Sequence, residues 1–126
     1  VDRSSTRSRS RSLRLLWKVL HNEGNIIVFP EGTFNETGGP LKEFYDGAFR
    51  LAINTQAPIM PMVFPDTVNR WNYTAWWKFW PGQNRVEYLK PVPTAGLALA
   101  DLPELKNRIF DDMSAALKKY NYPDTR

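Results

Sequence analysis

The stretch Asn25-Ile26-Ile27-Val28-Phe29-Pro30-Glu31-Gly32-Thr33 decides the interpretation of this chain. Its first five residues are mostly β-branched or aromatic and stand between a glycine and a proline, which predicts a short strand. A wholly apolar run of this kind is typical of a strand that is buried on both faces in an α/β sheet. Ligands of such sheets bind beyond the carboxyl ends of the strands, so Glu31, Gly32 and Thr33 are predicted to lie at a binding site.

Residues 30 to 33 also suit an ordinary turn, because proline, glycine and small polar residues form turns in many proteins. Taken alone, they leave both interpretations open. In a binding site, Gly32 would allow a close approach between the backbone and a ligand, and Thr33 would offer a hydroxyl and an amide.

Two further motifs follow the first at characteristic spacing. Phe44-Tyr45-Asp46-Gly47 precedes a predicted helix, and Pro58-Ile59-Met60-Pro61 begins a second predicted strand. Together with the Phe-Pro-Glu-Gly-Thr block, these motifs resemble the glycerolipid acyltransferase family, which includes 1-acyl-glycerol-3-phosphate acyltransferases. The resemblance extends from Val1 to about Val92. It implies an α/β fold, part of the glycerolipid-acyltransferase type, with a mixed sheet flanked by helices.

The resemblance also implies a substrate-binding set. Val1-Asp2-Arg3 resembles the end of the family's preceding block, whose arginine contacts the phosphate of the acceptor; Arg3 is the matching residue. The third block implies that Glu31, Gly32 and Thr33 lie at the acceptor. The family usually has arginine where this chain has Phe34, which cannot donate a hydrogen bond to phosphate. Either Lys42, Arg3 or Arg50 takes that role, or the acceptor differs from lysophosphatidate.

The family's catalytic base is absent from this sequence. In the family, a His-x4-Asp block deprotonates an acceptor hydroxyl, which then attacks the thioester of acyl-CoA or acyl-carrier protein. This chain has one histidine, His21, and Ile26 stands where the aspartate would be. We expect His21 to lie at a helix end, where a basic residue suits the helix dipole. Residues 1–126 are therefore predicted to be a single C-terminal portion of an acyltransferase domain, with no catalytic residue and no activity of its own.

Two functions from other classes use the same residues. A non-catalytic module could bind a lipid phosphate in the same pocket. A basic RNA-binding module, the less favoured hypothesis, would use the Arg-Ser repeat of Ser4–Ser12 together with the tryptophans. We favour a helix for this repeat, and we hypothesise that Arg7, Arg9 and Arg11 meet anionic headgroups or donor phosphates.

Four of the five tryptophans lie within Asn69–Trp80, next to basic residues. Tryptophan with basic neighbours favours the interface of a bilayer, where the ring can be half wet. A loop folded onto the sheet, with the rings in the core, explains the same composition. The sequence leaves these two interpretations open.

Composition narrows the class of partner and cofactor. The chain has 126 residues, enough for one core, no cysteine and one histidine, so neither a disulfide nor a zinc site is expected. No cofactor is expected besides the acyl donor. The net charge of +4 suits an anionic partner, and the resemblance favours a membrane surface over nucleic acid. No apolar run is long enough to cross a bilayer, so we expect a peripheral protein on the cytoplasmic side of the membrane.

Periodicity predicts the remaining elements. Helices are expected over Ser4–Leu20, with a solvated first half and a buried second half, over about Asp46–Asn54 and over Asp101–Tyr120. Strands are expected over Ile59–Phe64 and Arg85–Lys90. If strands that normally precede Arg3 are missing, an unpaired sheet edge would be exposed, and self-association through that edge is predicted.

Overall fold

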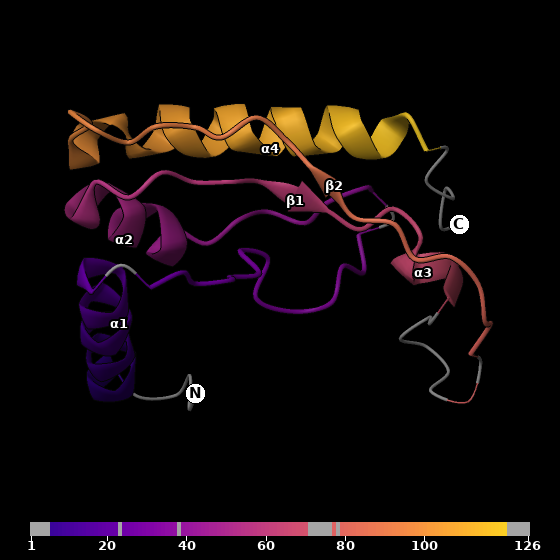
Figure 1. The fold of residues 1–126 in the computed structure, drawn as a ribbon, viewed down its shortest axis with the longest axis horizontal. Helices are drawn as coiled ribbons and strands as arrows, with labels where there is room; N and C mark the ends of the chain where they lie inside the picture. Colours follow the sequence, from indigo (N-terminus) through magenta and orange to yellow (C-terminus); the bar gives the residue numbers. More distant parts are fainter. Residues whose placement is uncertain (1–5, 23, 38, 71–76, 78, 121–126) are drawn as a thin grey trace.

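The computed structural model describes residues 6–22, 24–37, 39–70, 77 and 79–120. In chain order the elements are α1 (Thr6–His21), α2 (Gly47–Thr55), β1 (Met62–Val63), α3 (Thr67–Arg70), β2 (Glu87–Tyr88), the 3-10 turn η1 (Leu99–Asp101) and α4 (Leu102–Lys118). In Figure 1, α4 runs along one side of the molecule and the β1 and β2 segments lie beneath it. Helices α1 and α2 lie together at one end, and α3 lies at the other.

The core forms where α4 covers α2 and the chain segments that flank the strands. The predicted apolar stripe of α4 is confirmed, because its buried residues recur at helical spacing: Leu102, Leu105, Ile109, Ala116 and Leu117. Phe44 lies at the centre of this core, with its ring 5.1 Å edge-on from Phe110 and 6.0 Å from Phe49. The Phe44 side chain thus anchors the segment that precedes α2.

The sheet that the structure describes is one antiparallel pair. Met62 pairs with Tyr88 and Val63 with Glu87, and an isolated bridge joins Ile59 to Val92. The two predicted strands are therefore in the right places but short, since prolines deprive this part of the chain of several ladder donors. Val63 faces α4, and side chains alternate along a strand, so Met62 points to the opposite face.

The predicted buried strand over Asn25–Phe29 is wrong for this structure. The segment is not in a strand, and no hydrogen bond between it and another strand occurs among the described residues. Ile27 and Phe29 are each 71% exposed. A strand exists only where a neighbouring backbone supplies the ladder, and a favourable apolar sequence cannot replace that neighbour. Self-association through this region stays a prediction.

Helix α1 is present as predicted, but its second half is not buried. Leu15 is 64% exposed and Trp17 also remains exposed, because α2 covers only one side of the helix. The Trp17 ring stacks on His21, with ring centroids 4.8 Å apart, and His21 lies exposed at the helix end as expected. Arg11 is exposed, whereas the side chains of Arg7 and Arg9 fall outside the described part of the structure.

The surroundings of the tryptophans and of Gly47 are visible in part. Trp77 and Trp80 are exposed, so neither is a core residue, while Trp71 and Trp76 lie outside the described residues. A Cβ atom placed on Gly47 would meet no atom within 4 Å, so neither packing nor close backbone approach requires glycine there. No helix in the described part of the chain has the length and apolar content to cross a membrane.

Candidate functional site

The turn that follows Phe29 has the geometry that its glycine allows. The amide of Gly32 donates a hydrogen bond of 3.1 Å to the carbonyl of Phe29, which closes the turn. Gly32 has φ of 69°, in the left-handed region that glycine enters without steric cost. The structure therefore confirms the turn, although the segment before it is not a strand.

Three hydrogen bonds tie this turn to the segment before α2. The amide of Lys42 donates to Oε2 of Glu31 at 2.7 Å, and Nζ of Lys42 donates to the hydroxyl of Thr33 at 2.7 Å. The amide of Tyr45 donates to the carbonyl of Pro30 at 2.9 Å. Because the neighbouring Phe44 is fixed in the core, these bonds position the turn relative to the rest of the fold.

The structure brings together four of the five predicted site residues: Glu31, Gly32, Thr33 and Lys42. Arg3, the fifth, lies outside the described residues. The ammonium group of Lys42 reaches this turn through its hydrogen bond to Thr33, next to Phe34, so Lys42 stays a candidate for the role of the family arginine. An ammonium group with three donors can contact a phosphate oxygen as a compact point charge.

Glu31 is half-buried and accepts a backbone hydrogen bond, which limits what it can do. Burial raises the pKa of Glu31 above its ordinary value of 4.5, against the opposing effects of the hydrogen bond from the Lys42 amide and of the Lys42 charge. One of its carboxylate oxygens is directed at the backbone of its own domain. This arrangement suits a residue that shapes the turn better than a catalytic base.

A polar loop borders the turn and is stabilised by its own hydrogen bonds. Asn35 is its centre: its Nδ2 donates to the carbonyl of Gly39 at 2.8 Å, and its Oδ1 accepts from the amide and the hydroxyl of Thr37 at 3.0 and 2.7 Å. Asn35 was not among the predicted site residues. The Asn-x-Thr spacing could have indicated this turn, since an asparagine side chain often forms a hydrogen bond with the backbone two residues later.

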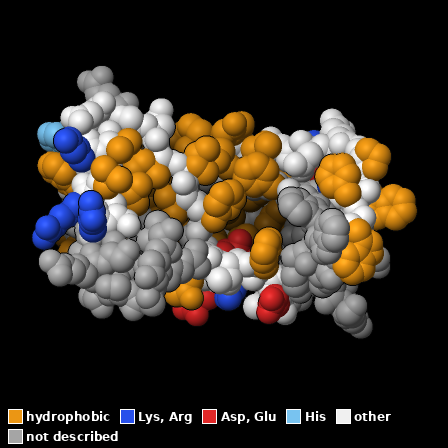
Figure 2. Space-filling model, turned by 90° about the horizontal axis from the view of Figure 1, so that it is seen from below, with side chains coloured by type: hydrophobic (Ala, Val, Ile, Leu, Met, Phe, Trp, Pro, Cys, Tyr) orange, Lys and Arg blue, Asp and Glu red, His pale blue; other side chains and the backbone are white. Residues whose placement is uncertain are grey.

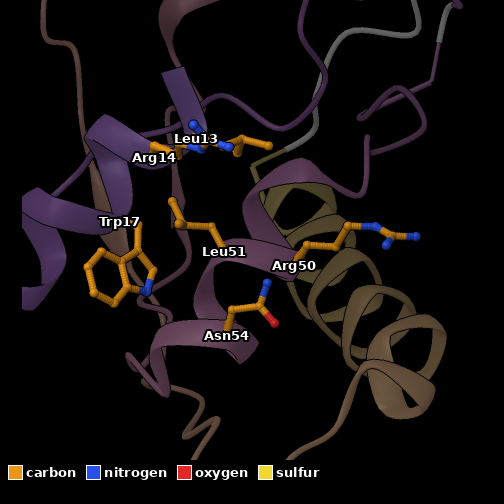
Figure 3. A pocket seen from close by; sticks show the side chains of 6 residues that line it. All are labelled: Leu13, Arg14, Trp17, Arg50, Leu51 and Asn54. Carbon is orange, nitrogen blue, oxygen red and sulfur yellow. The ribbon is translucent and has the colours of Figure 1, made fainter. Parts of the chain in front are cut away.

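A crevice of about 290 Å³ lies between α1 and α2, away from these residues. Figure 3 shows the side chains that line it: Leu13, Arg14, Trp17, Arg50, Leu51 and Asn54. None of the four predicted site residues that the structure describes lines this crevice. Arg50, one of the cations considered as a substitute for the family arginine, therefore lies on another surface. In the described part of the chain, no group of three or more histidine or acidic side chains could hold a metal ion.

Comparison with known proteins decides the family. The model of the family named Acyltransferase matches residues 1–65, which include the turn and its Lys42 partner. The chain belongs to the acyltransferase family. The chain is 37% identical over 106 residues to human 1-acyl-sn-glycerol-3-phosphate acyltransferase alpha, an alignment that covers 80% of this chain and 35% of the relative. It is 41% identical over 88 residues to the human beta enzyme, covering 70% of this chain and 31% of that relative.

A solved structure agrees with the sequence relatives. The chain superposes with a TM-score of 0.76, at 26% identity, on the crystal structure of the 1-acyl-sn-glycerophosphate acyltransferase PlsC from Thermotoga maritima. The match covers 88% of this chain and 44% of the other, and it confirms the predicted fold class. The chain spans about a third of the length of the two human relatives and less than half of the Thermotoga protein.

Proposed function

We propose that this chain supplies the acceptor-binding part of an enzyme of phospholipid biosynthesis. The enzyme transfers a fatty acyl group from acyl-CoA or acyl-carrier protein to a lysophospholipid such as 1-acyl-glycerol-3-phosphate. Residues 1–126 act as one part of the acyltransferase domain. The relatives are 1-acyl-sn-glycerol-3-phosphate acyltransferases, which supports the reaction class and the acceptor class.

The proposal depends mainly on the position of Lys42. Its Nζ lies 2.7 Å from the Thr33 hydroxyl, at the turn that the family motif identifies, and its backbone amide holds the Glu31 carboxylate. With the carboxylate engaged by the backbone, the ammonium group and the hydroxyl are available to an acceptor phosphate. Phe34 is exposed beside them and offers apolar contact without a donor.

The chemical step requires a base that this sequence does not contain. An acceptor hydroxyl is a poor nucleophile until its proton is removed, and in the family a histidine paired with an aspartate does this. We therefore propose that the 126-residue chain binds the acceptor without transferring an acyl group. Thioester release above background by the purified chain would contradict this part of the proposal.

Binding of lysophosphatidate below its critical micelle concentration tests the proposal by calorimetry. Losing a charge-assisted contact in Lys42→Gln should weaken binding roughly 10- to 100-fold. The matched control is Lys118→Gln, an exposed lysine at the end of α4, which should bind as the wild type does. A monoacylglycerol, which lacks the phosphate, should not distinguish Lys42→Gln from the wild type. Equal lysophosphatidate affinity for the two lysine variants would refute the assignment of Lys42.

We also propose a peripheral location at the cytoplasmic surface of the membrane. The acceptor is a lipid, and acyl-CoA or acyl-carrier protein would reach the enzyme from the aqueous side. Beyond the donor, the reaction as proposed requires no cofactor.

A further inference from the structure

Three aromatic residues project from the end of the molecule that carries α3. Trp77 is 68% exposed, and Phe79 and Trp80 are each 66% exposed; we call these three residues the aromatic tip. Figure 2 shows hydrophobic side chains gathered at this end of the molecule. The acceptor turn is built from other residues, so the aromatic tip has no part in the site described above.

The base of the aromatic tip is fixed to α3. The amide of Trp80 donates to the carbonyl of Arg70 at 2.9 Å, and Nε of Arg70 donates to the carbonyl of Gln83 at 2.9 Å. Asp66 completes the base, since its two carboxylate oxygens accept from the guanidinium of Arg85 at 2.7 and 2.8 Å. These hydrogen bonds hold the backbone from which the Trp80 ring projects.

The exposed area is large enough to signify a binding surface. An aromatic side chain can bury 150–250 Å² and these three are about two-thirds exposed, so together they present roughly 300–500 Å². An exposed apolar area of this size is comparable to the largest patch on a typical monomer, which is often functional, so it favours an interaction site.

Charge and ring chemistry indicate the kind of partner. Asp66 and Arg85 neutralise each other, which leaves Arg70 as a positive charge at the base of the aromatic tip. Tryptophan and arginine together suit the boundary between lipid headgroups and acyl chains, where the ring is partly dehydrated and the cation meets phosphate. We infer that the aromatic tip inserts into the interface of an anionic bilayer. This inference rests on the proposed peripheral location and names the surface responsible for it.

Vesicle co-sedimentation tests this assignment. The wild-type chain should bind phosphatidylcholine vesicles that contain phosphatidylserine, and salt should weaken that binding. The variant Trp77→Ser/Phe79→Ser/Trp80→Ser should bind roughly tenfold less, because binding strength scales with the buried apolar area. The matched control Met60→Ser/Tyr88→Ser removes two other exposed apolar residues and should bind like the wild type. Thermal unfolding of all three proteins confirms that the variants are folded.

The possible outcomes distinguish the inferred role of the aromatic tip from the proposed peripheral location of the protein. Equal vesicle binding by the tip variant and the wild type would overturn the inference and leave the peripheral location standing. No vesicle binding by the wild type would refute both. Binding of a single-stranded oligonucleotide that depends on the aromatic tip, or a dimer that the tip substitutions dissolve without vesicles present, would assign the surface to a different partner. Quenching of wild-type tryptophan fluorescence by brominated lipid, lost in the tip variant, would support insertion directly.

Discussion

The half-buried carboxylate of Glu31 offers the sharpest test of how the acceptor turn is held. Glu31→Gln keeps an oxygen that can accept from the Lys42 amide but removes the charge. Glu31→Ala removes the acceptor altogether. The wild-type contact is 2.7 Å long and joins two segments that are eleven residues apart. If this hydrogen bond organises the turn, the two substitutions should have clearly different effects on stability.

The expected size of each effect follows from the hydrogen bond. A buried amide left without an acceptor costs about 1–3 kcal/mol, and because water reaches this half-exposed site the lower half of that range applies to Glu31→Ala. Glu31→Gln exchanges a charged acceptor for a neutral one but also relieves the burial of a charge. These two changes oppose each other, so the free energy of unfolding at neutral pH should stay within about 1 kcal/mol of the wild type.

The pH dependence of stability provides an independent test, because the direction of the change can be predicted. Burial holds the pKa of Glu31 above 4.5 in the folded state, so the folded protein binds this proton more tightly than the unfolded chain. The contribution of Glu31 to stability is therefore greatest below pH 4.5 and falls as the pH rises through its folded pKa. Glutamine does not titrate, so Glu31→Gln should gain stability relative to the wild type across that interval.

Urea unfolding followed by circular dichroism, at several pH values from 4 to 7, measures both effects. The slope of unfolding free energy against urea concentration must be the same for the wild type, Glu31→Gln and Glu31→Ala if the comparison is to report stability alone. A loss in Glu31→Gln equal to that in Glu31→Ala would show that the charge, and not the acceptor, holds the turn. A difference between Glu31→Gln and wild type that does not change with pH would refute the role assigned to burial.

Substitutions at Phe44, Gly32, Gly47 and Asp66 test other parts of the fold. Phe44→Ala should lower the free energy of unfolding by about 3–5 kcal/mol and Phe44→Leu by less than about 1.5 kcal/mol; equal losses in urea unfolding would show that the aromatic ring, and not the buried volume of the side chain, accounts for the stability. Gly32→Ala should cost about 1 kcal/mol or more, since φ is 69° there, whereas Gly47→Ala, at a site with open space, should not destabilise; a neutral Gly32→Ala in thermal unfolding would contradict the turn geometry. The hydrogen bonds from Arg85 hold the pKa of Asp66 well below its usual 3.8, so Asp66 stabilises the fold above pH 3.8 and this contribution is lost as the pH falls towards the folded pKa. Acid titration of Asp66→Asn should show a shallower loss of stability below pH 3.8, and a profile parallel to that of the wild type would exclude this pair as a cause of acid unfolding.

Helices α2 and α4 and the acceptor turn could be predicted because their causes are local. A helix needs only its own backbone for its hydrogen bonds and one covered stripe, so the spacing of Leu105 and Ile109 was sufficient. The grouping of Glu31, Gly32 and Thr33 with Lys42 joins residues within a dozen positions of one another. The family motif therefore singled out Glu31, Gly32 and Thr33, and the absence of a donor at Phe34 drew attention to Lys42 as one candidate among several.

Other features depend on contacts that no local pattern encodes. The apolar run Asn25–Phe29 satisfies every compositional requirement of a strand, yet a strand is a relation between two backbones, and here no described neighbour takes part. In the same way, the tryptophan-rich segment suits either a core or a lipid interface. The tertiary structure leaves the rings of Trp77 and Trp80 exposed, with the amide of Trp80 hydrogen-bonded to the carbonyl of Arg70. Hydrogen bonding within a segment can be inferred from its order of residues, whereas burial and strand pairing require knowing what lies opposite it in space.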